Sequence, residues 1–352
     1  MKSNANLTAK SWRNFKINPF FTCGENEKEK KKMKRNIAVI VSVLALALGA
    51  QSAFAQEDAA SAAGVQISGG ATIVLQGASK VHDGSDKGSI EASYSYDLEL
   101  SKEFDNDSSI FVHIEGSAGE GLNSKLNLFN VLNGDAGSSN NALEITELWY
   151  EKGLFDKKLT LTFGKLDAAG YFDANEAANS ETDQFLAGMF VNNAAVALPD
   201  PNLGLRATYA PIESVELTYA YFNQNEEWNN IDTNGFNIIE AVYKLSDKGN
   251  YRLAYWANAA GATDIKDGER TLDYGIGLSV DQSVSENIIL FARFGYRNQQ
   301  ANTVEIEYED DGVTPAKITI SPQTSWSFGA QFKGALWSRE NDAVGIAVGQ
   351  NM

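Results

Sequence analysis

A strict alternation of apolar and polar residues between Ile90 and Leu100 is the feature that most constrains the fold of this chain. Successive side chains of a β-strand point to opposite faces, so this segment would have one apolar face and one polar face. A soluble sandwich turns the apolar face of such a strand inward, whereas an outer-membrane β-barrel turns it outward, toward lipid. The same pattern recurs along the chain behind an export signal, which favours the barrel.

The export signal lies between Met33 and Ala55. A basic start is followed by an apolar stretch, Ile37–Leu48, and by the sequence Ala-Phe-Ala at 53–55. These three parts in this order are typical of a secretory signal peptide, and the apolar stretch is short for a membrane span. We therefore expect Met33 to be the initiator and residues 1–32 to be an over-extended gene start; a genuine long leader is the alternative.

Removal of residues 1–55 changes both the cysteine content and the charge. The only cysteine, Cys23, falls in the removed part, so the exported chain would have neither a disulfide scaffold nor a thiol nucleophile. Residues 1–55 hold 10 of the 29 Lys and Arg and 3 of the 46 Asp and Glu, which leaves 19 basic and 43 acidic residues and a formal net charge of −24. So acidic a chain would repel nucleic acid. Divalent cations would bridge its acidic loops to an anionic outer leaflet.

Period-two alternation and turn residues predict about thirteen strands after residue 55, and no segment there is apolar enough for a membrane-spanning helix. The predicted strands are 65–76, 89–101, 109–117, 143–151, 158–166, 203–210, 214–223, 235–244, 250–258, 271–281, 287–297, 324–333 and 342–350. Short and long connections alternate between them, as they do between the two ends of outer-membrane barrels. We expect an all-β chain with one antiparallel barrel domain over 56–352.

The number of predicted strands, thirteen, is odd. Bacterial single-chain barrels have even strand numbers, and an open sheet edge in lipid leaves backbone groups unpaired. The sequence also ends Gly-Gln-Asn-Met, without the terminal aromatic residue that outer-membrane barrels usually present to the barrel assembly machinery. We therefore expect one or more strands to be missing from the C-terminus.

Several segments, in this order and spacing, resemble the carbohydrate-selective porin family, OprB. The resemblance extends from about residue 143 to the end and rests on Leu143–Glu151, Leu159–Asp167, Tyr171–Glu176, Phe190–Asn193 and Arg339–Gly345, with Gln184-Phe-Leu between the third and fourth. It implies a sixteen-stranded outer-membrane barrel through which monosaccharides and small oligosaccharides diffuse. Two alanines follow the paired asparagines, where the family often has proline, which puts the loop geometry at that point in doubt.

Residue parity within the predicted strands assigns polar side chains to the lumen. A channel for uncharged sugars needs hydrogen-bond donors and acceptors at its narrow point, and aromatic faces for the apolar side of a pyranose. The long segment 167–202 is expected to fold inward and narrow the channel. The candidate pore-lining residues are Glu115, Glu147, Lys165, Asp167, Arg206, Glu240, Arg252, Trp256, Arg293 and Arg297.

Two details refine this set. Trp256 is the expected stacking platform for a sugar ring. Arg293 and Arg297 are four residues apart on one strand, which rises about 3.3 Å per residue, so at most one of them is expected at the narrowest level. For each charge the alternative is an ordinary solvated lumen wall.

No feature of the sequence favours an enzyme, a metal site or a cofactor. The two histidines, His82 and His113, have no cysteine or spaced partner, and no G-x-S-x-G motif supports a serine hydrolase. The acidic run Glu305–Asp311 lacks the ligand pattern of a calcium loop, and a solvated external loop is the expectation.

A passive, sugar-preferring channel in a Gram-negative outer membrane is the leading hypothesis. The alternatives are a general diffusion porin without sugar preference and a non-conducting surface barrel that acts as an adhesin or structural protein. The expected partners are small sugars, outer-membrane lipid with its lipopolysaccharide and the barrel assembly machinery, with a homotrimer as the assembly common among porins.

Overall fold

The structure is a computed structural model that describes residues 64–78, 88–125, 131–137, 143–224, 231, 234–263, 270–298, 304–308, 315–320 and 322–352. The predicted signal peptide, the segment 1–32 and His82 lie outside the described residues. Among the described residues, no helix is long and apolar enough to cross a membrane.

One sheet of thirteen antiparallel strands forms the wall of the molecule, and each predicted strand is present. Every strand of this sheet pairs with its neighbours in chain order. Its strands are β1 (Gln66–Ala78), β2 (Ser89–Phe104), β3 (Ser108–Ala118), β4 (Glu144–Leu154), β5 (Leu159–Leu166), β6 (Asn202–Ile212), β7 (Val215–Phe222), β8 (Phe236–Lys244), β9 (Gly249–Thr263), β10 (Arg270–Ser285), β11 (Ile288–Arg297), β14 (Thr324–Lys333) and β15 (Ala343–Asn351).

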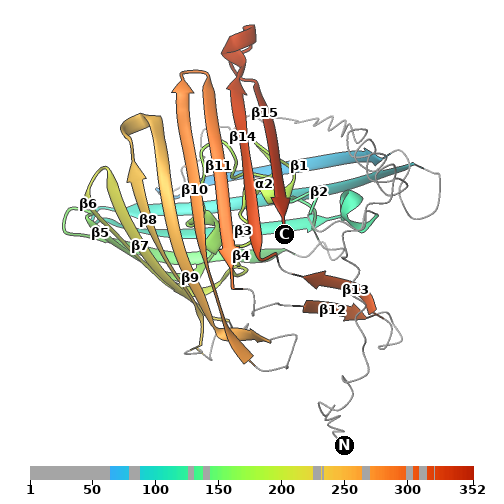
Figure 1. Cartoon of the computed structure of the whole chain (residues 1–352). Coiled ribbons are helices and arrows are strands. Elements are labelled where there is room, and N and C mark those ends of the chain that lie inside the picture. The colour runs from blue at the N-terminus through green and yellow to red at the C-terminus, as the bar shows by residue number, and fades with distance from the viewer. Residues whose placement is uncertain are drawn as a thin grey trace, which may run out of the picture.

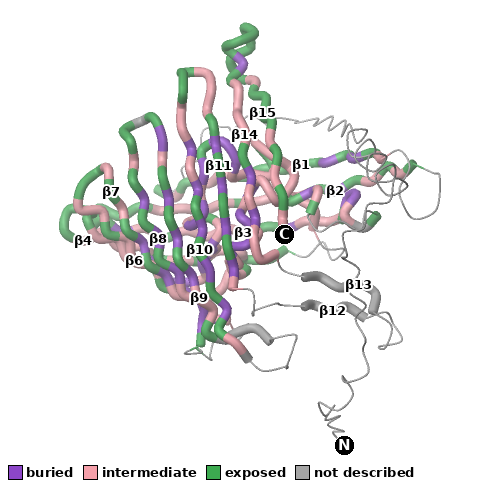
Figure 2. The backbone as a smooth tube through the Cα atoms, viewed as in Figure 1, coloured by how far each residue is buried: buried purple, intermediate pink, exposed green. Residues whose placement is uncertain are grey.

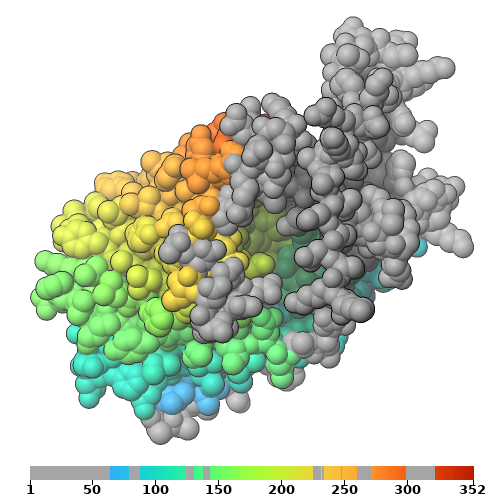
Figure 3. All heavy atoms as spheres, turned by 90° about the horizontal axis from the view of Figure 1, so that it is seen from below, coloured from blue at the N-terminus to red at the C-terminus, as the bar shows by residue number. Residues whose placement is uncertain are grey.

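The sheet curls around an interior. In Figure 1, β1–β4 lie behind and β10, β11, β14 and β15 stand in front, with β5–β9 turning between them at one side. In the view turned by 90°, the colours follow one another from blue to orange across the surface, as expected for strands added in chain order (Figure 3). Within the described residues, β1 and β15 are the two edges of the sheet and are not paired with each other.

The polarity of the two faces of the sheet is the reverse of that in a soluble protein: the outer face is apolar and the inner face is charged. Large apolar side chains are exposed on the outer face, among them Ile73, Leu253 and Phe163, with exposed fractions of 61, 57 and 56%. Charged residues on the inner face are buried, among them Arg293 and Asp281, with whole-residue exposed fractions of 3 and 2%. Buried and exposed residues therefore alternate along β9, β10 and β11 in Figure 2. A sheet with this polarity is suited to lipid outside and a polar interior.

Connections of different length gather at the two ends of the sheet. At one end they span 105–107, 155–158, 213–214, 245–248, 286–287 and 334–342, the last two strands being joined through the 3₁₀ helix η5 (Gly334–Trp337). At the other end they include 119–143, 167–201 and 298–323. The predicted long connection 259–270 is shorter than expected, because β9 and β10 extend to Thr263 and Arg270.

The connection between β11 and β14 contains an additional hairpin. β12 (Val304–Tyr308) pairs with β13 (Pro315–Ile320) in a separate two-stranded sheet. The expectation of a plain loop at Glu305–Asp311 is therefore wrong for its first half, and residues 309–314 lie outside the described residues. Residues 304–308 alternate apolar and acidic residues, a strand pattern that their high charge concealed.

Candidate functional site

The segment 167–201, which joins β5 to β6, folds against the inner face of the sheet. It begins with the 3₁₀ helix η3 (Ala168–Gly170), whose first turn is capped by the Asp167 side chain, and it contains the single helical turn α2 (Gly188–Val191). Its contacts reach β8, β10, β11 and β15, all of which follow it in the chain. We call it the inner segment.

Arg293 on β11 holds three points of the inner segment together. Its guanidinium donates from Nη1 to the Phe190 carbonyl at 2.8 Å and from Nη2 to the Asp173 carbonyl at 2.8 Å. Nη2 also donates to Asn179 Oδ1 at 3.3 Å, and Nε lies 3.1 Å from Asp173 Oδ2. Both charged side chains are buried, with exposed fractions of 1% for Arg293 and 3% for Asp173. A planar guanidinium with five N–H groups is suited to such multiple anchoring.

Asp173 continues this network in the opposite direction. Its Oδ2 accepts from the backbone N–H of Asn193 at 2.7 Å, and its own backbone N–H donates to Glu240 Oε2 on β8 at 3.1 Å. Burial raises the pKa of the Asp173 carboxyl above its usual value, and the neighbouring Arg293 guanidinium opposes that shift. The Arg293–Asp173 pair therefore fastens the inner segment to the wall around Asp173 and around Phe190–Asn193.

Glycines on the inner face let the inner segment approach the strands closely. A Cβ on Gly277 of β10 would lie 2.6 Å from Cγ2 of Val196, and one on Gly295 of β11 would overlap the carboxamide of Asn193. On β15, a Cβ at Gly345 would lie 2.6 Å from the ring of Phe185. The three glycines thus leave room for the inner segment to pack against the strands, and we call them the glycine seat.

Trp256 is buried and does not offer a face to a sugar, which corrects the expectation of a stacking platform. Its exposed fraction is 0%, and its ring stacks on Phe236 with the centroids 5.7 Å apart. Phe172 and Val196 of the inner segment belong to the same buried cluster. The inner segment covers the aromatic face that parity had assigned to the lumen.

The other inward arginines of this wall are also engaged within it. Arg252 on β9 pairs with Asp281 at 2.6 Å, and Arg297 on β11 donates from Nε to Asp273 at 2.8 Å. Like Arg293 and Glu240, they are buried. The three arginines thus neutralise buried carboxylates, and Glu240 accepts a hydrogen bond from the inner segment. None of these four candidates lines open space.

The candidates on β4, β5 and β6 remain partly accessible. The Arg206 guanidinium lies 4.0 Å from the centre of the Tyr171 ring and donates from Nη2 to Glu151 at 2.7 Å, with 15% of the side chain exposed. Glu147 Oε2 accepts from Trp149 Nε1 at 3.2 Å and from the backbone of Asp167 at 3.3 Å. Donors, acceptors and an aromatic ring are thus combined at this point.

Uncompensated acidic groups gather on the inner face of β2 and β3. Asp97 lies opposite Glu115, and Glu99 lies opposite His113, in the strand register. One donor atom each of Asp97, Glu99 and His113 lies within 4.8 Å of the others, and His113 Nε2 lies 3.8 Å from Glu115 Oε1. Because the arginines of the other wall are paired, the accessible lumen carries a negative balance.

We expect this balance to make a pore along this face of the sheet prefer cations. Carboxylates that face a pore attract cations and exclude anions. The double substitution Asp97→Asn with Glu115→Gln should reduce the reversal potential measured in a KCl gradient, while Glu286→Gln at an exposed short turn should leave it unchanged.

Burial raises the pKa of the Asp135 carboxyl, in the β3–β4 connection, so that group takes up its proton at a higher pH than an ordinary aspartate. The cation preference should accordingly weaken on acidification; an anion preference at neutral pH would contradict this interpretation.

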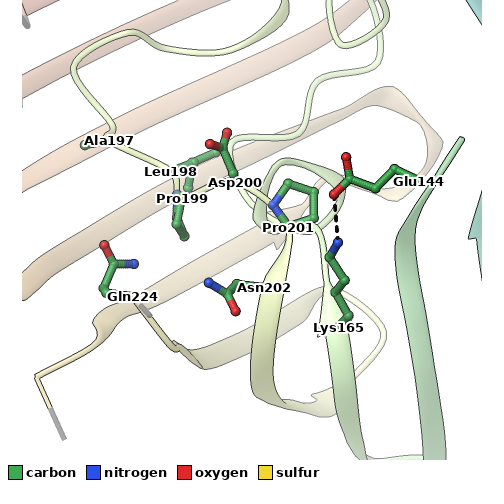
Figure 4. A pocket seen from close by; sticks show the side chains of 9 residues that line it. All are labelled: Glu144, Lys165, Ala197, Leu198, Pro199, Asp200, Pro201, Asn202 and Gln224. Atoms are coloured by element: carbon green, nitrogen blue, oxygen red, sulfur yellow. Dashed lines mark hydrogen bonds and ion pairs between the residues drawn. The ribbon is translucent and has the colours of Figure 1, made fainter. Parts of the chain in front are cut away.

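A pocket of about 720 Å³ opens at the long-connection end of the wall, between β4–β7 and the final stretch of the inner segment (Figure 4). We call it the rim pocket. Lys165 lies on the outer-face side of β5, and its ammonium reaches Glu144 Oε1 at 3.3 Å and the Ile145 carbonyl at 2.7 Å. The residues that line the pocket are Glu144, Lys165, Ala197, Leu198, Pro199, Asp200, Pro201, Asn202 and Gln224.

Comparison with known proteins gives three findings. A family model described as "Carbohydrate-selective porin, OprB family" matches residues 81–352. A curated relative from Aquifex aeolicus, described as "Uncharacterized protein", is 27% identical over 146 residues, and the alignment spans 42% of this chain and 42% of that relative. The chain thus spans less than half the length of this relative.

The third finding is a likeness to solved structures. The high-pH structure of Pseudomonas putida OprB has a TM-score of 0.64 and 19% identity, covering 81% of this chain and 74% of that chain. The low-pH structure of the same protein has a TM-score of 0.51 and 15% identity, covering 81% of this chain and 77% of that chain. At these identities the likeness shows the fold.

Proposed function

Because the chain belongs to the carbohydrate-selective porin family, OprB, we propose that it forms a passive outer-membrane channel for monosaccharides and small oligosaccharides. One observation carries this proposal: a long connection, the inner segment, is seated on the polar inner face of a sheet whose outer face is apolar. This arrangement narrows an otherwise wide lumen at a fixed place, and selectivity then depends on width and lining groups.

The accessible candidates have the chemistry that a neutral sugar requires. A sugar hydroxyl both donates and accepts, so it pairs with carboxylates and with cationic donors alike. Glu115, Glu147, Asp167 and Arg206 are the predicted pore-lining residues that stay outside the buried contact with the arginines of β9 and β11. The prediction for Lys165 is corrected, because that residue has the strand parity of the outward Phe163 and belongs to the rim pocket. We propose that the sugar path follows the β3–β6 side of the lumen.

The placement in the cell follows from the same polarity. We propose that residues 33–55 direct export, that the short connections face the periplasm and that the long connections face outside. The apolar outer face would contact lipid and lipopolysaccharide after insertion by the barrel assembly machinery, and a homotrimer would be the functional assembly. The acidic lumen argues against nucleic acid as a partner.

Swelling of proteoliposomes tests the proposal. Vesicles that contain the folded chain should swell in isotonic glucose and more slowly in maltose and maltotriose, because a narrowed pore separates neutral solutes by size. Vesicles with heat-denatured protein are the control. Equal rates for sugars and for sugar alcohols of the same size would favour a general diffusion porin, and no swelling with folded protein would favour a non-conducting surface barrel.

A further inference from the structure

The rim pocket is built mainly from rigid elements. Glu144 begins β4, Lys165 lies near the end of β5, Asn202 begins β6 and Gln224 follows β7, so neighbouring strand ends supply one side. Figure 4 shows the stretch 197–201 passing opposite them. Side chains held by strands keep their geometry better than those of loops.

The opposite side of the rim pocket is formed by the stretch Ala197-Leu-Pro-Asp-Pro201, which we call the divider. This stretch is stiff, because each proline fixes its own backbone angle and restricts the residue before it. The same five residues also line a second pocket of about 470 Å³, on the side of Asp167 and Asn193. The divider therefore lies between two accessible spaces, the rim pocket and the pocket that Asp167 and Asn193 also line.

The groups that face the rim pocket are complementary to a neutral sugar ring. Asp200 is exposed, and among the described residues its carboxylate has no hydrogen-bond or ion-pair partner. Two amides, of Asn202 and Gln224, add donors and acceptors, and the side chains of Leu198 and Pro199 add an apolar surface. A volume of about 720 Å³ also lies in the range of about 300–1,000 Å³ that is usual for small-molecule sites.

We propose that the rim pocket captures one neutral pyranose unit at the channel mouth, with the Asp200 carboxylate accepting from two adjacent hydroxyls. The Glu144–Lys165 pair and the two amides orient the ring, and its apolar side packs on Leu198 and Pro199. This inference rests on the proposed sugar channel and adds a binding step before the narrow point. Such a step raises the local sugar concentration beside the inner segment, of which the divider is the final stretch.

Protection of an introduced cysteine tests the capture site. In the full chain with Cys23→Ser, the substitution Ala197→Cys places a thiol in the rim pocket, and a neutral maleimide modifies it. Maltose should slow this modification severalfold. The same maltose concentration should not slow the modification of Glu213→Cys, which lies in an exposed short turn at the other end of the sheet.

A second substitution identifies the ligand group. Adding Asp200→Ala to Ala197→Cys should raise the maltose concentration for half-protection about tenfold, the loss expected for hydrogen bonds to a charged group. Protection by CaCl2 equal to that by maltose would overturn the inference in favour of a cation site. Blockage of the channel by maltose without protection of the thiol would overturn the capture site and leave the sugar channel intact, whereas neither blockage nor protection would remove both.

Discussion

Replacing Arg293 by methionine is expected to raise the single-channel conductance severalfold and to make the current noisy. The substitution removes the contacts to Phe190, Asn179 and Asp173 together, so the inner segment loses its attachment to β11 at these three residues. It also leaves the Asp173 carboxylate buried without its main counter-charge, a change that typically costs about 3–5 kcal/mol. The inner segment should then leave the wall part of the time and open the lumen.

The matched control is Arg339→Met. Arg339 also forms an ion pair, with Asp342 at 2.7 Å, but 72% of its side chain is exposed at a short connection. This variant should keep the native conductance and lose little stability, as exposed pairs contribute about 0–1 kcal/mol. The double substitution Arg293→Met with Asp173→Asn should recover part of the stability and keep the high conductance. A native conductance for Arg293→Met in folded protein would show that Arg293 does not hold the inner segment.

A side chain added at the glycine seat should have the opposite effect on the current. In Gly295→Ala the new Cβ would overlap the carboxamide of Asn193, and in Gly277→Val the new atoms would overlap Val196. Because Arg293 still holds the neighbouring part of the inner segment, the displaced stretch should move toward the lumen centre. We expect a lower conductance, a stronger dependence on sugar size and a loss of about 1–3 kcal/mol from overpacking.

Gly77→Ala on β1 is the control for the seat, because nothing lies closer than 4.0 Å to a Cβ built there. Conductance and thermal unfolding should both be measured for each variant. If Gly295→Ala and Gly277→Val conduct and unfold like the native chain, the inner segment does not rest on these glycines.

The strands were predictable because their signal is local. On β10, Leu272, Tyr274 and Ile276 alternate with Asp273 and Gly275, and no distant residue is needed to interpret that pattern. Strand ends were less certain, since β9 and β10 extend beyond the point where alternation weakens. The β12–β13 hairpin was harder to predict, because acidic residues at alternate positions of Val304–Tyr308 give the segment the charge of a solvated loop.

The candidate site was predictable only as a face of the sheet. Parity assigned Arg252, Arg293 and Trp256 to the inner side, but it could not show that the inner segment covers them. That cover depends on contacts between residues more than 100 positions apart, such as Arg293 with Asp173. One signal was available: inward glycines at 277 and 295 on a wall of large side chains indicate that another backbone lies close.

Single-channel recording with maltose tests the central claim most directly. Protein extracted from outer membranes should give stepwise currents in a planar bilayer, and maltose should reduce them saturably, because the sugar binds inside a lumen that the inner segment narrows. In Arg293→Met the currents should be larger and less sensitive to maltose. Native currents that maltose leaves unchanged would contradict a sugar channel built in this way.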